Sequence, residues 1–103
     1  MSLVQNYHNL WFNSFRLANT SGHKDPVQLR LVAGQQLPAE ITGACRTQSI
    51  DPFLLLTECS KDLFYKYPVG TKFLLKVKLT DKAGLGLFFY TSYKWKALEI
   101  VAP

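Results

Sequence analysis

Apolar and polar residues alternate most regularly between residues 72 and 93. Over 72–81 the period is two, which is typical of a strand with one buried face, and the polar face is mostly cationic. The apolar set is Phe73, Leu75, Val77 and Leu79. The polar set is Lys72, Lys76, Lys78 and Thr80. A polar, glycine-containing turn then leads to a second apolar run over 86–93, so the pattern predicts a β-hairpin.

The second run of this hairpin is less regular than the first. Leu87 and Phe89 can share its inner face with the apolar set of 72–81. This assignment directs Phe88 and Tyr90 outward, beside the lysines. The hairpin is therefore expected to have two faces that need partners.

The N-terminal segment fits a helix over 3–18. Ser2 and Gln5 have the spacing of a capping box, and the asparagines along the segment count against a helix. Phe12 also lies off the apolar arc, so a strand over 9–17 remains the alternative. At 100° per residue one arc collects Leu3, Val4, Tyr7, Leu10, Trp11, Phe15, Leu17 and Ala18.

Shorter apolar segments separated by turn-forming residues follow. They predict strands at 27–33, 39–48 and 53–59, a short helix near 60–67, and a last strand within 97–102. The 103 residues suffice for one core, so we expect a single domain, 1–103. The order of elements predicts a mainly β fold: a small five- or six-stranded OB-like or SH3-like barrel with an N-terminal amphipathic helix.

The net charge of +5 is confined to one half of the chain. Acidic and basic residues balance over 1–59, whereas lysine carries the whole excess over 60–103. Lysine suits phosphates and acidic surfaces in general, while arginine is the usual reader of bases. A polyanionic partner would therefore be bound with little sequence preference.

Several classes of protein find no support in the sequence. The first residues lack a cationic signal-peptide region and no apolar run reaches the length of a membrane span, so we expect a cytoplasmic protein without a membrane partner. Cys45 and Cys59 are expected to be free thiols. His8 and His23 are isolated, so neither a metal nor a cofactor is expected. No sequence motif indicates an activated nucleophile, so we predict that the protein is not an enzyme.

Residues 67–95 resemble short uncharacterised bacterial proteins, some of which are carried on integron gene cassettes. The resemblance consists of a Val-Gly-Thr entry at 69–71, Lys-Leu-Thr-Asp at 78–81 and Tyr-x-Ser-Tyr-x-Trp at 90–95. It covers under a third of the chain. Leu85, between two glycines, departs from the pattern at the turn. The resemblance implies a compact β-rich domain and no active site.

Lysines and aromatic residues of the C-terminal half form a candidate nucleic-acid site. Side chains two apart on a strand are about 7 Å apart, which is comparable to the nucleotide spacing of an extended single strand. The lysines would hold phosphates while the aromatic rings stack on bases. The alternative is that Phe88 and Tyr90 are covered by the N-terminal helix or by a dimer interface, while the lysines form a solvated edge that discourages strand-to-strand aggregation. The candidate residues are Lys72, Lys76, Lys78, Phe88, Tyr90, Lys94 and Trp95.

A second hypothesis concerns protein partners. Tyr7, Trp11 and Phe15 make the apolar arc of the N-terminal segment wide, and aromatic residues are enriched at interfaces. They are therefore candidates for a homodimer or protein-interaction surface. The leading prediction is a non-catalytic binding module for single-stranded nucleic acid or an acidic partner. Assembly is the alternative, with a small-molecule binder or an enzyme as the lesser one.

Overall fold

The computed structural model describes residues 6–16, 27–81, 86–92 and 94–103, without the side chain of Phe64. Six strands and three short helical segments lie in these ranges. In chain order they are β1 His8–Arg16, β2 Val27–Leu31, α1 Ala39–Thr47, the 3-10 helix η1 Pro52–Leu54, β3 Thr57–Glu58, α2 Asp62–Tyr65, β4 Lys72–Asp81, β5 Leu87–Tyr90 and β6 Glu99–Val101.

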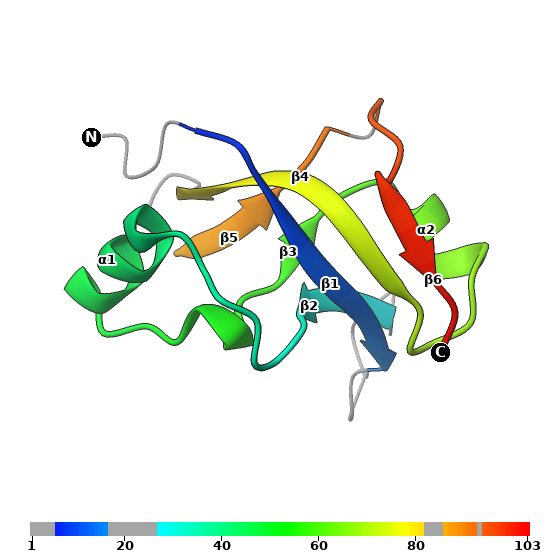
Figure 1. Ribbon diagram of the computed structural model, residues 1–103, viewed down its shortest axis with the longest axis horizontal. Coiled ribbons are helices and arrows are strands. Elements are labelled where there is room, and N and C mark those ends of the chain that lie inside the picture. The colour runs from blue at the N-terminus through cyan, green and yellow to red at the C-terminus, as the bar shows by residue number, and fades with distance from the viewer. Residues whose placement is uncertain (1–5, 17–26, 82–85, 93) are drawn as a thin grey trace.

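The strands form one curled sheet in the order β2-β1-β4-β5-β3, with β6 pairing with β4 beside this path (Figure 1). The pair β3–β5 is parallel and the other pairs are antiparallel. The result is a mainly β, nearly closed barrel of five or six strands, as the sequence predicts. The short α2 lies between β3 and β4, where an OB-like barrel has its helix.

The interior of the barrel confirms the alternation along β4. The four apolar residues predicted to face inward on β4 are all buried, as are Leu87 and Phe89 of β5. Phe12 of β1 meets Phe89 edge to face, with ring centroids 5.5 Å apart. The favourable edge-to-face geometry adds to the large apolar area that each ring removes from water.

The predicted helix over 3–18 is wrong, because residues 8–16 form β1. Leu10, Phe12 and Ser14 alternate into the interior, and Phe12, which lay off the helical arc, is fully buried. Pairing with β2 on one side and β4 on the other outweighs the local helical pattern. The alternative strand is thus nearly correct. The proposed Ser2–Gln5 cap lies outside the described residues.

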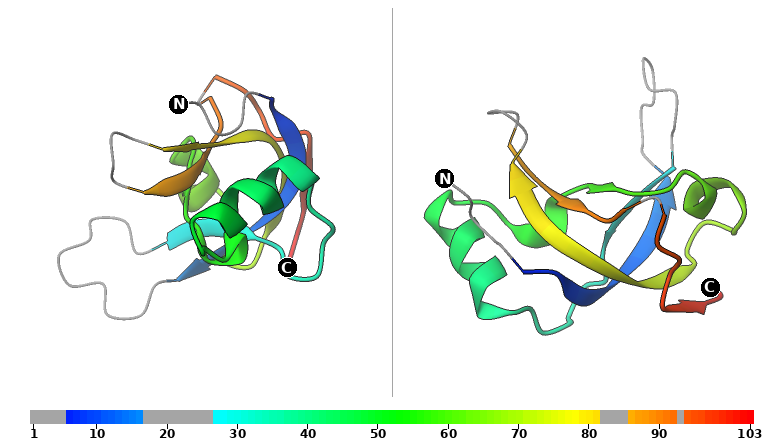
Figure 2. Two further views of the ribbon diagram at one scale, coloured as in Figure 1. Left: turned by 90° about the vertical axis from the view of Figure 1, so that its left-hand side faces the viewer. Right: turned by 90° about the horizontal axis from the view of Figure 1, so that it is seen from above.

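The predicted strand over 39–48 is also wrong, because this segment forms α1. Ile41 and Cys45 are its buried residues. Their spacing of four places them on one face of a strand and on one face of a helix alike, so the spacing does not discriminate. Figure 2 shows α1 at one end of the barrel.

Other segments agree with the prediction in kind but are shorter. Only Thr57–Glu58 is a strand within 53–59, because η1 begins the segment, with the Asp51 carboxylate accepting from Phe53 N–H. The helix near 60–67 and the last strand are present as α2 and β6. The hairpin turn over 82–85 lies outside the described part of the chain.

Candidate nucleic-acid interface

The lysines of β4 project from the outer face of the barrel. Their direction follows from the strand itself, because the alternate side chains are buried inside. On the outer face the neighbouring strand β1 places Asn9 opposite Lys76 and Asn13 opposite Lys72. This side of the sheet therefore combines cations with amide side chains.

Two of these lysines meet aromatic rings from distant parts of the chain. The rings of Tyr7 and Trp95 are edge to face, with centroids 5.0 Å apart. Lys76 Nζ lies 5.1 Å from the Trp95 centroid and 5.9 Å from that of Tyr7. Lys78 Nζ lies 5.4 Å from the Tyr7 centroid. We name Tyr7, Lys76, Lys78 and Trp95 the aromatic–lysine cluster.

The geometry of the aromatic–lysine cluster gives it a defined chemistry. An ammonium within about 6 Å of a ring centroid is attracted by about 0.5–1 kcal/mol at an exposed site, so the rings help to hold the lysines in place. Lys76 and Lys78 are two positions apart on one strand face, which separates them by about 7 Å. Trp95 remains 42% exposed. The cluster thus offers two positioned cations beside an accessible indole ring.

Phe88 and Tyr90 occupy the outer face of β5, as predicted, but in different surroundings. Tyr90 is directly opposite Lys78 and adjoins the aromatic–lysine cluster, whereas Phe88 is opposite Thr80. Both side chains are half-buried. Phe88 also lines a cavity with Leu56, away from the lysines. The structure therefore brings Tyr90 but not Phe88 to the lysines.

Lys72 and Lys94 are not members of the aromatic–lysine cluster, although Lys94 precedes Trp95 directly in the chain. Lys72 is exposed four positions before Lys76, opposite Asn13 on one side and Val101 on the other. Lys94 is also exposed. Together with Trp95 and residues of α2 it lines a surface cavity of about 450 Å³. Neither ammonium belongs to the cation–ring contacts described above.

The predicted interface residues on β1, Trp11 and Phe15, are half-buried. Trp11 and Phe15 point outward, since Leu10, Phe12 and Ser14 take the interior positions. The Trp11 backbone binds Gln35, whose Oε1 accepts from Trp11 N–H at 3.1 Å and whose Nε2 donates to Trp11 O at 2.7 Å. The Arg30 guanidinium lies 4.2 Å from the Phe15 centroid. Tyr7 instead joins the aromatic–lysine cluster.

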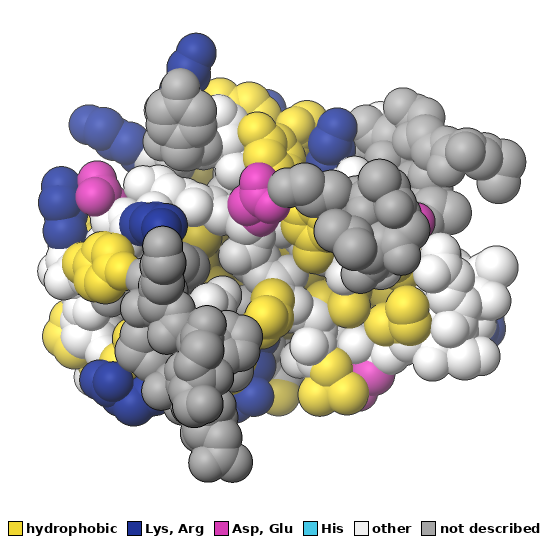
Figure 3. Space-filling model, turned by 180° about the vertical axis from the view of Figure 1, so that it is seen from behind, with side chains coloured by type: hydrophobic (Ala, Val, Ile, Leu, Met, Phe, Trp, Pro, Cys, Tyr) yellow, Lys and Arg dark blue, Asp and Glu magenta, His cyan; other side chains and the backbone are white. Residues whose placement is uncertain are grey.

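Side chains on the surface seen from behind are mixed in character. Figure 3 shows lysine and arginine side chains mostly on the half of this face away from α1, with apolar side chains in several separate groups among them. The aromatic–lysine cluster is distinguished from such scattered charges by its fixed contacts.

The ionisable groups that could support catalysis or metal binding are few. Both cysteines are free, and burial raises the pKa of each thiol, to about 12 for Cys59, so both are neutral near pH 7. His8 Nε2 and Glu40 Oε1 are 2.6 Å apart and join β1 to α1. The described residues hold no group of three His, Cys, Asp or Glu side chains suited to a metal ion.

A search for membrane-spanning helices and three comparisons with known proteins complete the description of the site. Among the residues that the structure describes, no helix is both long enough and apolar enough to cross a membrane. The chain matches no protein-family model, no curated protein and no solved structure. The resemblance of residues 67–95 to integron cassette proteins thus stays a prediction, and function has to be argued from the site.

Sequence reasoning missed the joining of Tyr7 to Trp95, because no local pattern links residues at opposite ends of a chain. It also missed the cavity beside Phe88, which includes the buried Thr57. One signal for that cavity was present: Thr57 is a polar residue that follows the apolar run 53–56.

Proposed function

We propose that this protein is a non-catalytic module that binds single-stranded nucleic acid through the aromatic–lysine cluster. The observation that supports it best is that Lys76 Nζ lies within 6 Å of the ring centroids of both Tyr7 and Trp95, at 5.9 and 5.1 Å. Phosphates of the nucleic acid would bind the ammonium groups of Lys76 and Lys78, while a base stacks on the exposed part of the Trp95 ring. Tyr90, opposite Lys78, extends the surface along β5.

The chemistry of the aromatic–lysine cluster favours binding without sequence preference. Lysine ammonium groups bind phosphate as point charges, and every base has a face that can stack. Glu58 is paired with Tyr90 in the β3–β5 ladder, and its negative charge would disfavour a nucleic-acid strand that continued toward β3. The proposed path therefore follows β4 and the segment around Trp95.

This proposal rests on the cluster and not on the barrel type. Oligonucleotide-binding OB barrels use the face of their second and third strands, whereas the aromatic–lysine cluster lies over β1 and β4. Fold likeness alone does not carry function. The position of the cluster makes the proposal testable residue by residue.

The test is the salt dependence of binding to a dye-labelled single-stranded oligothymidine, followed by the fluorescence anisotropy of the dye, a readout that does not need Trp95. In the variant Trp11→Phe, Trp95 is the sole tryptophan, since the chain has two, and its fluorescence reports stacking separately. Each neutralised phosphate releases about 0.7 of a counterion, so Lys76→Gln with Lys78→Gln should reduce the slope of log affinity against log salt by about one unit. Trp95→Ala should weaken binding by about 1–3 kcal/mol with little change in slope.

A matched control removes the same charge elsewhere. Arg46→Gln with Lys61→Gln alters two exposed cations outside the aromatic–lysine cluster and should leave the slope nearly unchanged. Equal effects of the two double variants would mean that net charge alone attracts the nucleic acid. Absence of any binding at low salt would rule out the proposed function.

Self-association is the second candidate function, and a different feature favours it. Within the described residues β6 pairs with β4 on one side only, so its other edge is free to pair with a strand. Leu98, Ile100 and Val101 are exposed at this edge. Two copies joined edge to edge would bury these side chains. Sedimentation of the protein and of Ile100→Lys tests this, since a dimer should become a monomer in the variant.

A further inference from the structure

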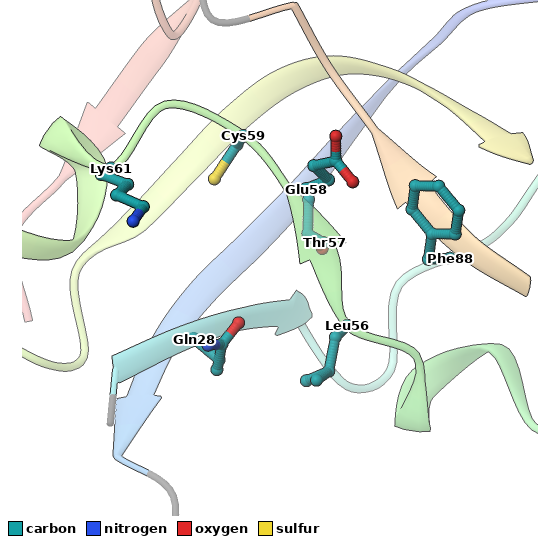
Figure 4. A pocket seen from close by; sticks show the side chains of 7 residues that line it. All are labelled: Gln28, Leu56, Thr57, Glu58, Cys59, Lys61 and Phe88. Carbon is teal, nitrogen blue, oxygen red and sulfur yellow. The ribbon is translucent and has the colours of Figure 1, made fainter. Parts of the chain in front are cut away.

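The barrel has a seam between β2 and β3. Within the described residues, β2 pairs only with β1 and β3 only with β5, so these end strands face each other without forming a ladder. A cavity of about 310 Å³ lies at this seam. Figure 4 shows Gln28 of β2 facing Thr57 of β3 and the preceding Leu56 across it, with Phe88 of β5 on one side of β3 and Cys59 and Lys61 toward α2.

Thr57 is the unusual residue of this cavity. Its side chain is only 5% exposed, and its hydroxyl oxygen is the one buried side-chain polar atom in the described part of the chain that lacks a hydrogen-bond partner. A buried polar group without a partner costs about 1–3 kcal/mol. Thr57 lines the cavity, so a molecule bound there can supply the missing partner if the side chain turns its buried hydroxyl toward it.

Thr71 shows how the same fold treats another buried threonine. It is 1% exposed, and its hydroxyl donates to the Pro68 carbonyl at 2.7 Å. The fold therefore satisfies a threonine hydroxyl where the residue is purely structural. The unsatisfied hydroxyl of Thr57 points to a role outside the fold.

The other residues of the cavity indicate what kind of molecule would fit. Leu56 and Phe88 supply apolar walls, and the Phe88 ring can stack on a flat partner. Cys59 contributes a neutral thiol, since burial and the nearby Glu58 raise its pKa. Glu58 and Lys61 carry opposite charges at the rim, so the cavity as a whole favours neither anions nor cations.

We propose that the seam between β2 and β3 is a binding site for a small, flat, uncharged aromatic molecule whose hydroxyl, carbonyl or ring nitrogen bonds Thr57 Oγ1. The volume of about 310 Å³ is at the lower end of the range for small-molecule sites and suits a single- or double-ring compound. No residue of the aromatic–lysine cluster lines this cavity, so the site is independent of the proposed nucleic-acid function.

The experiment uses phenol and toluene, which have the same shape and differ in the hydroxyl. Each is titrated at millimolar concentration into the isotope-labelled protein while backbone amide shifts are recorded. Phenol should bind more tightly than toluene and should shift the amides of residues 56–59 and 88. Thr57→Val should weaken phenol binding by about three- to tenfold and leave toluene binding unchanged.

A second variant and a control make the result decisive. Phe88→Leu should weaken both probes, because it removes the stacking wall without touching the hydroxyl. Thr47→Val, on the exposed end of α1, should change neither. The proposal is overturned if phenol leaves residues 56–59 unshifted. It is equally overturned if Thr57→Val leaves the ratio of phenol to toluene affinity unchanged.

Discussion

The β1–β4 sheet and the seam between β2 and β3 belong to one barrel but are constructed differently. Six residue pairs join β1 to β4, and alternate side chains fill the interior while the others carry the aromatic–lysine cluster outside. At the seam β3 has two residues, and the cavity includes both outward Leu56 and inward Thr57. On β4, fold and site use different residues; at the seam, they share them.

The two regions therefore differ in how far function can be altered without a loss of stability. Outer residues of β4 can be exchanged while the interior is untouched, so binding and folding should separate in mutants. At the seam a substitution changes the lining of the cavity and the packing of the interior together. The predictions below test this contrast, beginning with the largest effect.

The first prediction compares neighbouring aromatic residues of β1. Phe12 is fully buried, so Phe12→Ala should lower the free energy of unfolding by about 3–5 kcal/mol. Trp11 is half-buried on the outer face, so Trp11→Ala should cost clearly less. Urea denaturation of both variants measures the difference. A larger loss for Trp11→Ala would place the main packing of β1 on its outer face.

The second prediction compares two glycines. Gly70 has a φ of +98°, and an added Cβ would come within 3.2 Å of Pro103 Cβ, so Gly70→Ala should destabilise by more than about 1 kcal/mol. Gly43 lies within α1, where an added Cβ would meet nothing within 4 Å. Gly43→Ala should therefore stabilise by about 0.5–1 kcal/mol. Thermal unfolding of the two variants gives the sign of each stability change, and changes of the same sign would contradict the roles assigned to the two glycines.

The third prediction compares the two buried threonines. Thr71→Val removes a hydrogen bond to Pro68 O and should destabilise by about 1 kcal/mol. Thr57→Val removes an unpartnered hydroxyl and should leave stability unchanged or raise it. The denaturant midpoints of the two variants, each compared with that of the unsubstituted protein, measure these stability changes. Equal destabilisation by both variants would show that Thr57 Oγ1 has a partner in solution.

The fourth prediction concerns pH at the seam. Burial, and then Glu58, raise the pKa of Cys59 from 9.0 to about 12 in the folded protein. In the unfolded chain the thiol is no longer buried and its pKa returns to 9.0, so as the pH rises the unfolded chain loses the thiol proton at a lower pH than the folded protein does. The contribution of Cys59 to stability is thus complete below pH 9 and is lost between pH 9 and 12. Cys59→Ala should flatten the fall in urea midpoint over this range, and an unchanged fall would contradict the raised pKa.

The hairpin was the most predictable part of the molecule because its period of two persists along the ten residues of β4. Residues 39–48 were misread because a spacing of four suits both helix and strand, and burial of Ile41 and Cys45 at the end of the barrel decides for the helix. The N-terminal segment was ambiguous until pairing with β4 was known. Local periodicity cannot contain that information.

The candidate site was predictable in the same uneven way. The outward row of lysines follows from β4 alone, whereas the contact between Tyr7 and Trp95 depends on the closure of the sheet. The seam arises where β2 and β3 do not pair, and a sequence pattern identifies strands but not the missing pair. Thr57 was visible as the polar residue that follows the apolar run 53–56, but no sequence pattern gives it a function.

The separation of the two regions can be measured by mapping the amide shifts caused by oligothymidine at low salt, with and without saturating phenol. The account predicts that the oligonucleotide shifts residues 7, 76, 78 and 95, including the Trp95 indole N–H, and that phenol shifts residues 56–59 with each ligand binding equally well in the presence of the other. Oligonucleotide shifts concentrated at residues 56–59, or displacement of one ligand by the other, would contradict it.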